Sequence, residues 1–133
     1  MKTPYGHSMD LDLPYEQAIE KLTEALKVEG FGVLTTIDVK ATLKAKLDME
    51  FRRYVILGAC NPALAFRALS EELEIGLLLP CNAIVYERDE GGSTVSVIDA
   101  MAAMTFAGNP ALEPIAKEAS DRLERVLASL RIL

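Results

Sequence analysis

Two cysteines stand in matching contexts, because each is followed at once by an asparagine. Cys60-Asn61 comes directly before Pro62, and Cys81-Asn82 recurs further along the chain. Asparagine followed by proline is typical of a helix start, with Asn61 as the N-cap and Pro62 as the first helical residue. The unpaired amides at such a start favour negative charge, so Cys60 is a candidate nucleophile or sulfur carrier. The sequence therefore offers Cys60, with Cys81, as a candidate for thiol-dependent redox or sulfur chemistry.

The residues around both cysteines also support a purely structural role. Ile56, Leu57 and Ala59 precede Cys60, and buried cysteines usually behave as small apolar side chains. Asn82 lies in an apolar stretch, where a buried amide needs hydrogen-bond partners from the backbone or from a ligand. If the two segments are neighbours, one site results. The candidate ligand-binding residues of that site are Cys60, Asn61, Cys81 and Asn82.

No residue set supports a defined catalytic reaction. His7 is the only histidine, and two cysteines with one histidine do not form a tetrahedral metal site. The chain has no GxSxG, HExxH or glycine-rich phosphate-binding motif. We therefore predict no catalytic residue, no metal and no cofactor, and the sequence does not indicate an enzyme.

Composition limits the possible partners. The 133 residues are 50% hydrophobic with a net charge of −6, which favours a single domain over 1–133 and argues against nucleic-acid binding. The apolar excess predicts a homo-oligomer, most simply a dimer. One basic cluster stands out, and it either holds an anionic ligand or forms a solvated helix face, the simpler interpretation. Its members are Lys40, Lys44, Lys46, Arg52 and Arg53.

No segment predicts membrane insertion or export. The longest apolar run, 75–86, contains Gly76, Pro80 and Asn82 and is shorter than the ~20 residues that span a bilayer. Residues 1–12 lack the apolar segment of a signal peptide. We therefore expect a cytoplasmic protein that does not bind membranes and whose thiols stay reduced.

Hydrophobic periodicity and turn residues predict the elements that position the cysteines. Phe31, Val33, Thr35 and Ile37 are expected on one face of a strand. Pro80 is expected to cause a bulge or to mark an edge in its strand, because proline cannot donate to a ladder. The predicted strands cover 5–11, 31–37, 53–60, 75–88 and 93–98, and the predicted helices cover 15–29, 39–47, 62–73, 100–107 and a long C-terminal segment with Pro114 near its start. This order predicts an α+β fold, a mainly antiparallel sheet with helices packed on one face.

Four segments carry a resemblance to a known family. They are 29–35 (EGFGVLT), 37–43 (IDVKATL), 56–62 (ILGACNP) and 76–82 (GLLLPCN). With them the chain resembles the family called domain of unknown function 302 over nearly its whole length. The resemblance implies a fold similar to the TATA-binding-protein-like class, a curved antiparallel sheet with helices across one side. It implies no activity.

Three hypotheses follow from these observations. The first is a dimerising protein that binds a small or apolar ligand between sheet and helices, near the two cysteine-asparagine segments. The second is a thiol-dependent protein that uses Cys60 with Cys81. The third is a structural or interaction domain in which both segments only support the fold.

Overall fold

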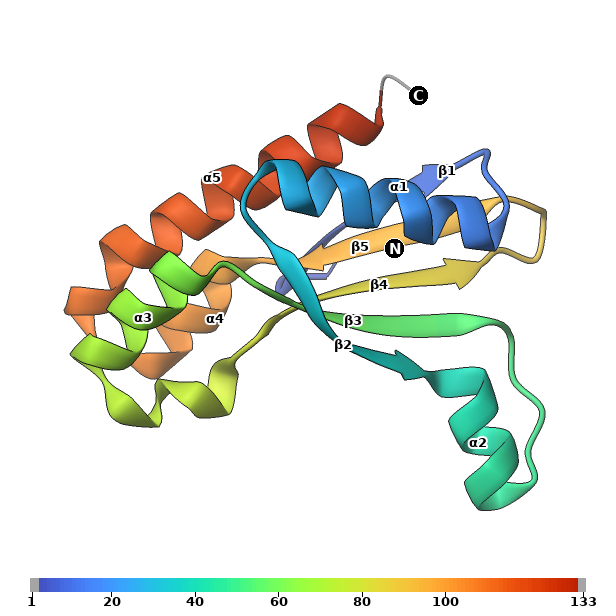
Figure 1. Ribbon diagram of the computed structural model, residues 1–133, viewed down its shortest axis with the longest axis horizontal. Coiled ribbons are helices and arrows are strands. Elements are labelled where there is room, and N and C mark those ends of the chain that lie inside the picture. The colour runs from blue at the N-terminus through green and yellow to red at the C-terminus, as the bar shows by residue number, and fades with distance from the viewer. Residues whose placement is uncertain (1–2, 132–133) are drawn as a thin grey trace.

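The computed structural model describes residues 3–131, and they form the predicted α+β fold around one antiparallel sheet (Figure 1). The five strands lie in the order β1-β5-β4-β3-β2. The strands are β1 (Gly6–Leu11), β2 (Gly32–Asp38), β3 (Tyr54–Cys60), β4 (Cys81–Glu87) and β5 (Ser93–Ile98). The helices are α1 (Tyr15–Val28), α2 (Val39–Leu47), α3 (Pro62–Glu71), α4 (Ala100–Ala107) and α5 (Glu113–Leu130), with short 3-10 helices η1 (Leu73–Leu78) and η2 (Pro110–Leu112).

Helices α1 and α5 cover one face of the sheet (Figure 1). Alternate residues of the central strands point into the resulting core, and burial of each large apolar side chain stabilises the fold by about 1.5–3 kcal/mol. The strands contribute Val55, Leu57, Ala59, Ala83, Val85, Val95 and Val97, and the two helices contribute Leu22, Leu26, Leu123, Val126, Leu127 and Leu130. The predicted packing of helices on one face is confirmed for this part of the molecule.

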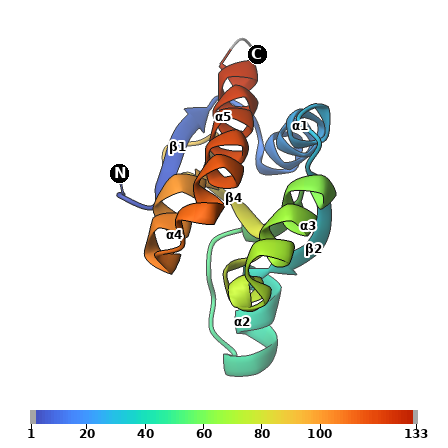
Figure 2. The ribbon, with the colours of Figure 1, turned by 90° about the vertical axis from the view of Figure 1, so that its left-hand side faces the viewer.

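The remaining helices lie at the two ends of the sheet. Helices α3 and α4 and the short η1 gather at one end, where Figure 2 shows them around the start of α5. Helix α2 projects from the other end (Figure 1) and has no buried residue. Its narrow apolar stripe, Val39, Leu43 and Leu47, therefore does not reach the core, as expected of a peripheral helix.

The predicted strand over 75–88 is wrong in its first half. Residues Leu73–Leu78 form η1, and strand β4 begins only at Cys81, directly after Pro80. Proline lacks the backbone N–H that a ladder requires, so Pro80 precedes the strand instead of forming a bulge within it. Cys81 consequently lies at the very start of an interior strand.

The predicted single face of β2 is also wrong, because the strand contains a bulge. Val33 pairs with Ala59 and Thr35 pairs with Gly58, so Leu34 is the extra residue and the register shifts there. A bulge reverses the alternation of side chains along the strand. Val33 therefore packs against the core, whereas Thr35 approaches the opposite side of β3 at Gly58.

Candidate functional site

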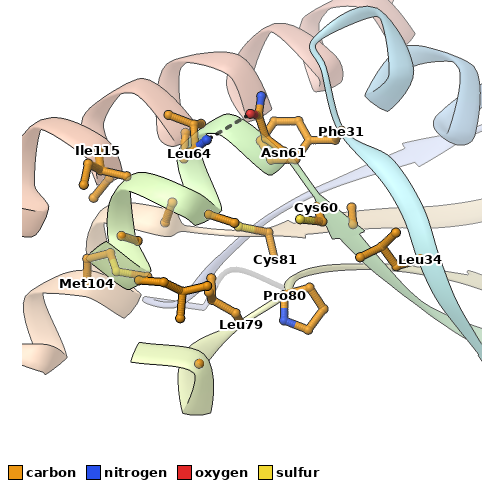
Figure 3. Close-up of a pocket in the computed structure, with 18 of the residues that line it drawn as sticks. Phe31, Leu34, Cys60, Asn61, Leu64, Leu79, Pro80, Cys81, Met104 and Ile115 are labelled. Carbon is orange, nitrogen blue, oxygen red and sulfur yellow. Dashed lines mark hydrogen bonds between the residues drawn. The ribbon is translucent and has the colours of Figure 1, made fainter. Parts of the chain in front are cut away.

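A cavity of about 360 Å³ opens at the end of the sheet where α3, α4 and η1 gather (Figure 3). Its floor comes from the ends of β2, β3 and β4, and its walls come from the helices. The lining residues are Phe31, Leu34, Thr35, Ala59, Cys60, Asn61, Leu64, Ala65, Ala68, Leu69, Gly76, Leu79, Pro80, Cys81, Ala100, Met104, Ile115, Ala116 and Ala119. None of them is charged, so the cavity favours an uncharged, apolar occupant.

Small side chains create this space. Ala65 and Ala68 of α3 and Ala116 and Ala119 of α5 line the cavity, while Gly76 contributes no side chain at all. Protein interiors are otherwise close-packed, because larger side chains interdigitate and leave few voids. A leucine at any of these alanine positions would fill part of the volume. These small residues therefore contribute to the space of the cavity.

The structure brings the two cysteines to this cavity from neighbouring strands. Cys60 ends β3 and Cys81 begins β4, and in the ladder Cys81 pairs with Ala59, the residue before Cys60. Both thiols are free, and both side chains line the cavity (Figure 3). Burial raises the pKa of the Cys81 thiol from an ordinary value of 9.0 to about 11, and the nearby Cys60 adds to this rise. Cys81 is therefore a protonated thiol at neutral pH.

Asn61 holds the cavity wall in place. Its side-chain Oδ1 accepts a hydrogen bond of 3.2 Å from the Leu64 backbone N–H, which makes it the predicted N-cap of α3. Its Nδ2 lies 3.5 Å from the Glu29 carbonyl at the end of α1, and Arg122 of α5 donates to the same carbonyl at 3.1 Å. Asn61 thus connects α3 with α1 and α5, and its amide is already satisfied by the protein.

Asn82 differs from the expectation of a buried amide. Its side chain is exposed and does not line the cavity. In β4 it alternates with Cys81 and Ala83, which face the core side, so Asn82 points to the face of the sheet that α1 and α5 leave open. An amide exposed to solvent there needs no protein partner. The cysteine-asparagine repeat in the sequence therefore does not produce a repeated site, and only Cys60, Asn61 and Cys81 of the four candidates meet.

The cavity floor depends on Gly58, which sequence reasoning did not identify. A Cβ atom at Gly58 would lie 2.1 Å from Thr35 Oγ1 and 2.9 Å from Pro80 Cγ, and both of those residues line the cavity. Glycine is needed where two neighbours approach the backbone this closely. The sequence signals available were the glycine inside an apolar strand and the proline beside Cys81.

The basic cluster lies away from the cavity, and local carboxylates neutralise most of it. Lys40 and Lys44 both lie within 3.8 Å of Glu50 carboxylate oxygens. Arg53 donates from its backbone N–H and its guanidinium to Glu87, which lowers the pKa of that carboxyl. These pairs favour the solvated-face interpretation over an anion site.

The part of the chain that the structure describes holds no cluster of three or more histidine, cysteine or carboxylate side chains placed to hold a metal ion. None of its helices is long and apolar enough to cross a membrane. His7 lies 3.3 Å from the Asp99 carboxylate, and its partner is therefore a protein group.

Comparison with known proteins identifies the family. The family model described as "Domain of unknown function DUF302" matches residues 7–130. The chain belongs to the DUF302 family. Among solved structures, it is similar to a crystal structure of an uncharacterized conserved DUF302 protein from Bacillus stearothermophilus, with 34% identity and a TM-score of 0.86. That match covers 95% of this chain and 98% of the other. No curated protein matches the chain. Membership in the DUF302 family thus confirms the resemblance and the fold and assigns no activity.

Proposed function

We propose that this DUF302 protein binds a small, uncharged, apolar molecule in the cavity between the sheet and helices α3 and α5. The observation that carries the proposal is a volume of about 360 Å³ lined without a single charged side chain. Pockets of this size that are mostly apolar are the usual form of a small-molecule site. Exclusion of water from such a surface supplies the driving force for binding.

The cavity volume limits the size of the ligand. A volume of about 360 Å³ lies near the lower end of the range of small-molecule pockets, about 300–1,000 Å³. A small ligand therefore fits, such as a bicyclic aromatic compound or a medium-length acyl chain. Asn61 offers little polar recognition, since its amide oxygen already accepts from Leu64 and its nitrogen points to Glu29.

In this proposal the two thiols act as apolar contacts. With a pKa of about 11, Cys81 is about one part in 10⁴ thiolate at neutral pH, and the thiolate is the reactive form. A protonated thiol packs like a small apolar group and contacts aromatic rings favourably. The second hypothesis is thiol-dependent redox or sulfur transfer. In it Cys60 is the residue that reacts, and Cys81 is its resolving partner.

A matched pair of substitutions on α3 tests the proposal. Ala65 lines the cavity, whereas Ala63, two residues earlier on the same helix, is exposed and does not. The fluorescent probe 1-aminonaphthalene should bind the wild-type protein with increased emission. Ala65→Phe should weaken this binding at least tenfold because its ring occupies the volume, while Ala63→Phe should leave it unchanged.

Two outcomes would contradict the proposal. A wild-type protein that does not bind the probe, or any of a series of uncharged aromatic compounds of similar size, has no functional apolar site. Equal binding by the wild type and by folded Ala65→Phe would place the probe elsewhere on the surface. Circular dichroism and the melting temperature establish that both variants fold.

The proposal also includes a quaternary state and a cellular location. The protein acts as a homodimer, a state supported by the large apolar side chains that it exposes, such as Leu77 and Phe106 at 85% and 84%. A cytoplasmic location, where Cys60 and Cys81 stay reduced, remains a prediction.

A further inference from the structure

Exposed apolar side chains gather in two places at opposite ends of the molecule. We call residues 37–51, which contain α2, the arm, and we call the exposed surface of α3, η1 and α4 the apolar end. Of the twelve large apolar side chains that are exposed in the described residues, four lie on the arm and five lie at the apolar end. The arm carries Ile37, Leu47, Met49 and Phe51, and the apolar end carries Phe66, Leu69, Leu73, Leu77 and Phe106.

Neither surface is covered by its own chain. Helix α2 has no buried residue, and Leu47 remains 65% exposed. At the apolar end, Leu73 and Leu77 are exposed at 81% and 85%, four residues apart on η1. Several large apolar side chains exposed together commonly mark an interaction surface. An exposed apolar arm that packs on little of its own fold and a bare apolar surface on the same chain are suited to each other.

Charge supports the same pairing. Helix α2 contains three lysines, and Asp48 and Glu50 of the same arm pair with two of them, Lys40 and Lys44. The third, Lys46, has no carboxylate within 4.0 Å in the described part of the chain, and neither Glu71 nor Glu74 at the apolar end has a basic partner there. Opposite charges at the rim of an apolar contact favour correct docking. Two apolar ends placed against each other would instead bring Glu71 and Glu74 of both copies together.

The arrangement of the two surfaces allows a closed dimer. In Figure 1 α2 and η1 lie at opposite ends of the long axis and both extend below the sheet. Figure 2, which looks along that axis, shows η1 in front of α2, so both lie on the same side of the molecule. A twofold axis perpendicular to the long axis then brings the arm of each copy onto the apolar end of the other. The contact forms twice and leaves no open surface for further copies.

We infer that a second copy of this chain binds the apolar end through its arm, with Leu47 and Met49 packing on Leu73 and Leu77. Leu69 and Gly76 belong both to the apolar end and to the cavity lining, so the docked arm also covers the cavity mouth. The contact between the arm and the apolar end is inferred from the exposed surfaces and does not depend on ligand binding. Only the covering of the mouth rests on the proposed ligand-binding function.

The test measures mass by light scattering with three matched variants of the full chain. The wild type should elute at about 29 kDa, twice the chain mass of 14.5 kDa. Leu47→Glu on the arm and Leu77→Glu at the apolar end should each shift the mass to the monomer. Val28→Glu is the control, because Val28 is 82% exposed on α1, outside both surfaces, and its dimer should remain intact.

Mixing the two monomeric variants distinguishes this arrangement from others. A pair of Leu47→Glu with Leu77→Glu has one intact arm facing one intact apolar end, so part of the dimer should return. A dimer lost in Leu77→Glu and kept in Leu47→Glu would show end-to-end contact and overturn the inference. A monomeric wild type at 100 μM, or a concentration-dependent series beyond the dimer, would also overturn it.

The same samples separate this inference from the proposed function. A monomer that binds 1-aminonaphthalene refutes the interface and leaves the cavity as the ligand site. A dimer that binds no probe refutes the cavity and leaves the interface. If both hold, probe release from the wild-type dimer should be slower than from Leu47→Glu, whose cavity mouth is uncovered.

Discussion

Replacement of Gly58 by alanine tests whether the cavity floor depends on close backbone approach. The added Cβ would lie 2.1 Å from Thr35 Oγ1 and 2.9 Å from Pro80 Cγ, both far inside normal contact distance. Gly58 is buried in β3 between β2 and β4, so neither neighbouring strand can move away without loss of ladder hydrogen bonds. The β-branched Thr35 has few alternative rotamers that would relieve the contact.

The expected cost follows from two opposed effects. Overpacking of a close-packed site typically costs about 1–3 kcal/mol. Replacement of a glycine by alanine also lowers the conformational entropy of the unfolded chain, which stabilises the folded state by about 0.4–1 kcal/mol. Gly58→Ala should therefore lower the free energy of unfolding by about 1–2 kcal/mol, measured by urea denaturation with an unchanged m-value.

Two further variants make this prediction specific. Gly32→Ala on the adjacent strand is the control, because a Cβ there meets no atom within 4 Å, so only the unfolded-chain effect remains and the free energy of unfolding should rise by about 0.4–1 kcal/mol. Thr35→Ala removes the hydroxyl that the new Cβ would strike, so the double variant should recover about 1 kcal/mol through coupling. Wild-type stability in Gly58→Ala, or a double variant with purely additive losses, would refute the close-approach argument.

Two other predictions concern the residues that meet at the cavity. Burial raises the pKa of Cys81 from 9.0 to about 11, so the folded state retains a proton that the unfolded chain loses first. This stabilisation is complete below pH 9 and is lost as the pH rises towards 11. Over that range the free energy of unfolding, measured by urea denaturation, should fall by about 2–3 kcal/mol more in the wild type than in Cys81→Ala. An equal dependence of the unfolding free energy on pH in both proteins would contradict the burial of this thiol. Asn61→Ala should cost about 1 kcal/mol as the α3 cap is lost, whereas Asn61→Asp, which keeps the bond from Leu64 and loses only the donor to Glu29, should cost less in the same assay. A greater loss in the aspartate variant would show that the contact with α1 outweighs the cap.

The sequence predicted the elements that carry strong local signals. The helix predicted over 100–107 is α4, which the Asp99 side chain caps by accepting from the Ala102 backbone N–H and which Gly108 ends in the left-handed conformation. Asn61-Pro62 likewise starts α3. Caps and helix-terminating glycines depend on a few adjacent residues, so their signal needs no knowledge of the rest of the chain.

The sequence failed where the outcome depends on contacts between strands. The apolar run before Pro80 has the composition of a strand, yet it folds as η1, because the ladder with β3 can begin only at Cys81. The bulge at Leu34 is equally absent from the sequence pattern, and it accompanies the close approach of Thr35 to Gly58 on the neighbouring strand. Asn82 was expected to be buried because its neighbours are apolar, whereas strand alternation places it on the open face.

These irregularities share one location, and this has a consequence for the site. The bulge at Leu34, the glycine at position 58 and the strand start after Pro80 all lie at the cavity floor. The cavity floor thus coincides with local departures from regular structure that sequence patterns miss. A cavity that depends on small side chains and a shifted strand register can be recognised only once the strands are assembled. Cys60 and Cys81 therefore predicted where a site lies, but they did not predict that it is an apolar cavity.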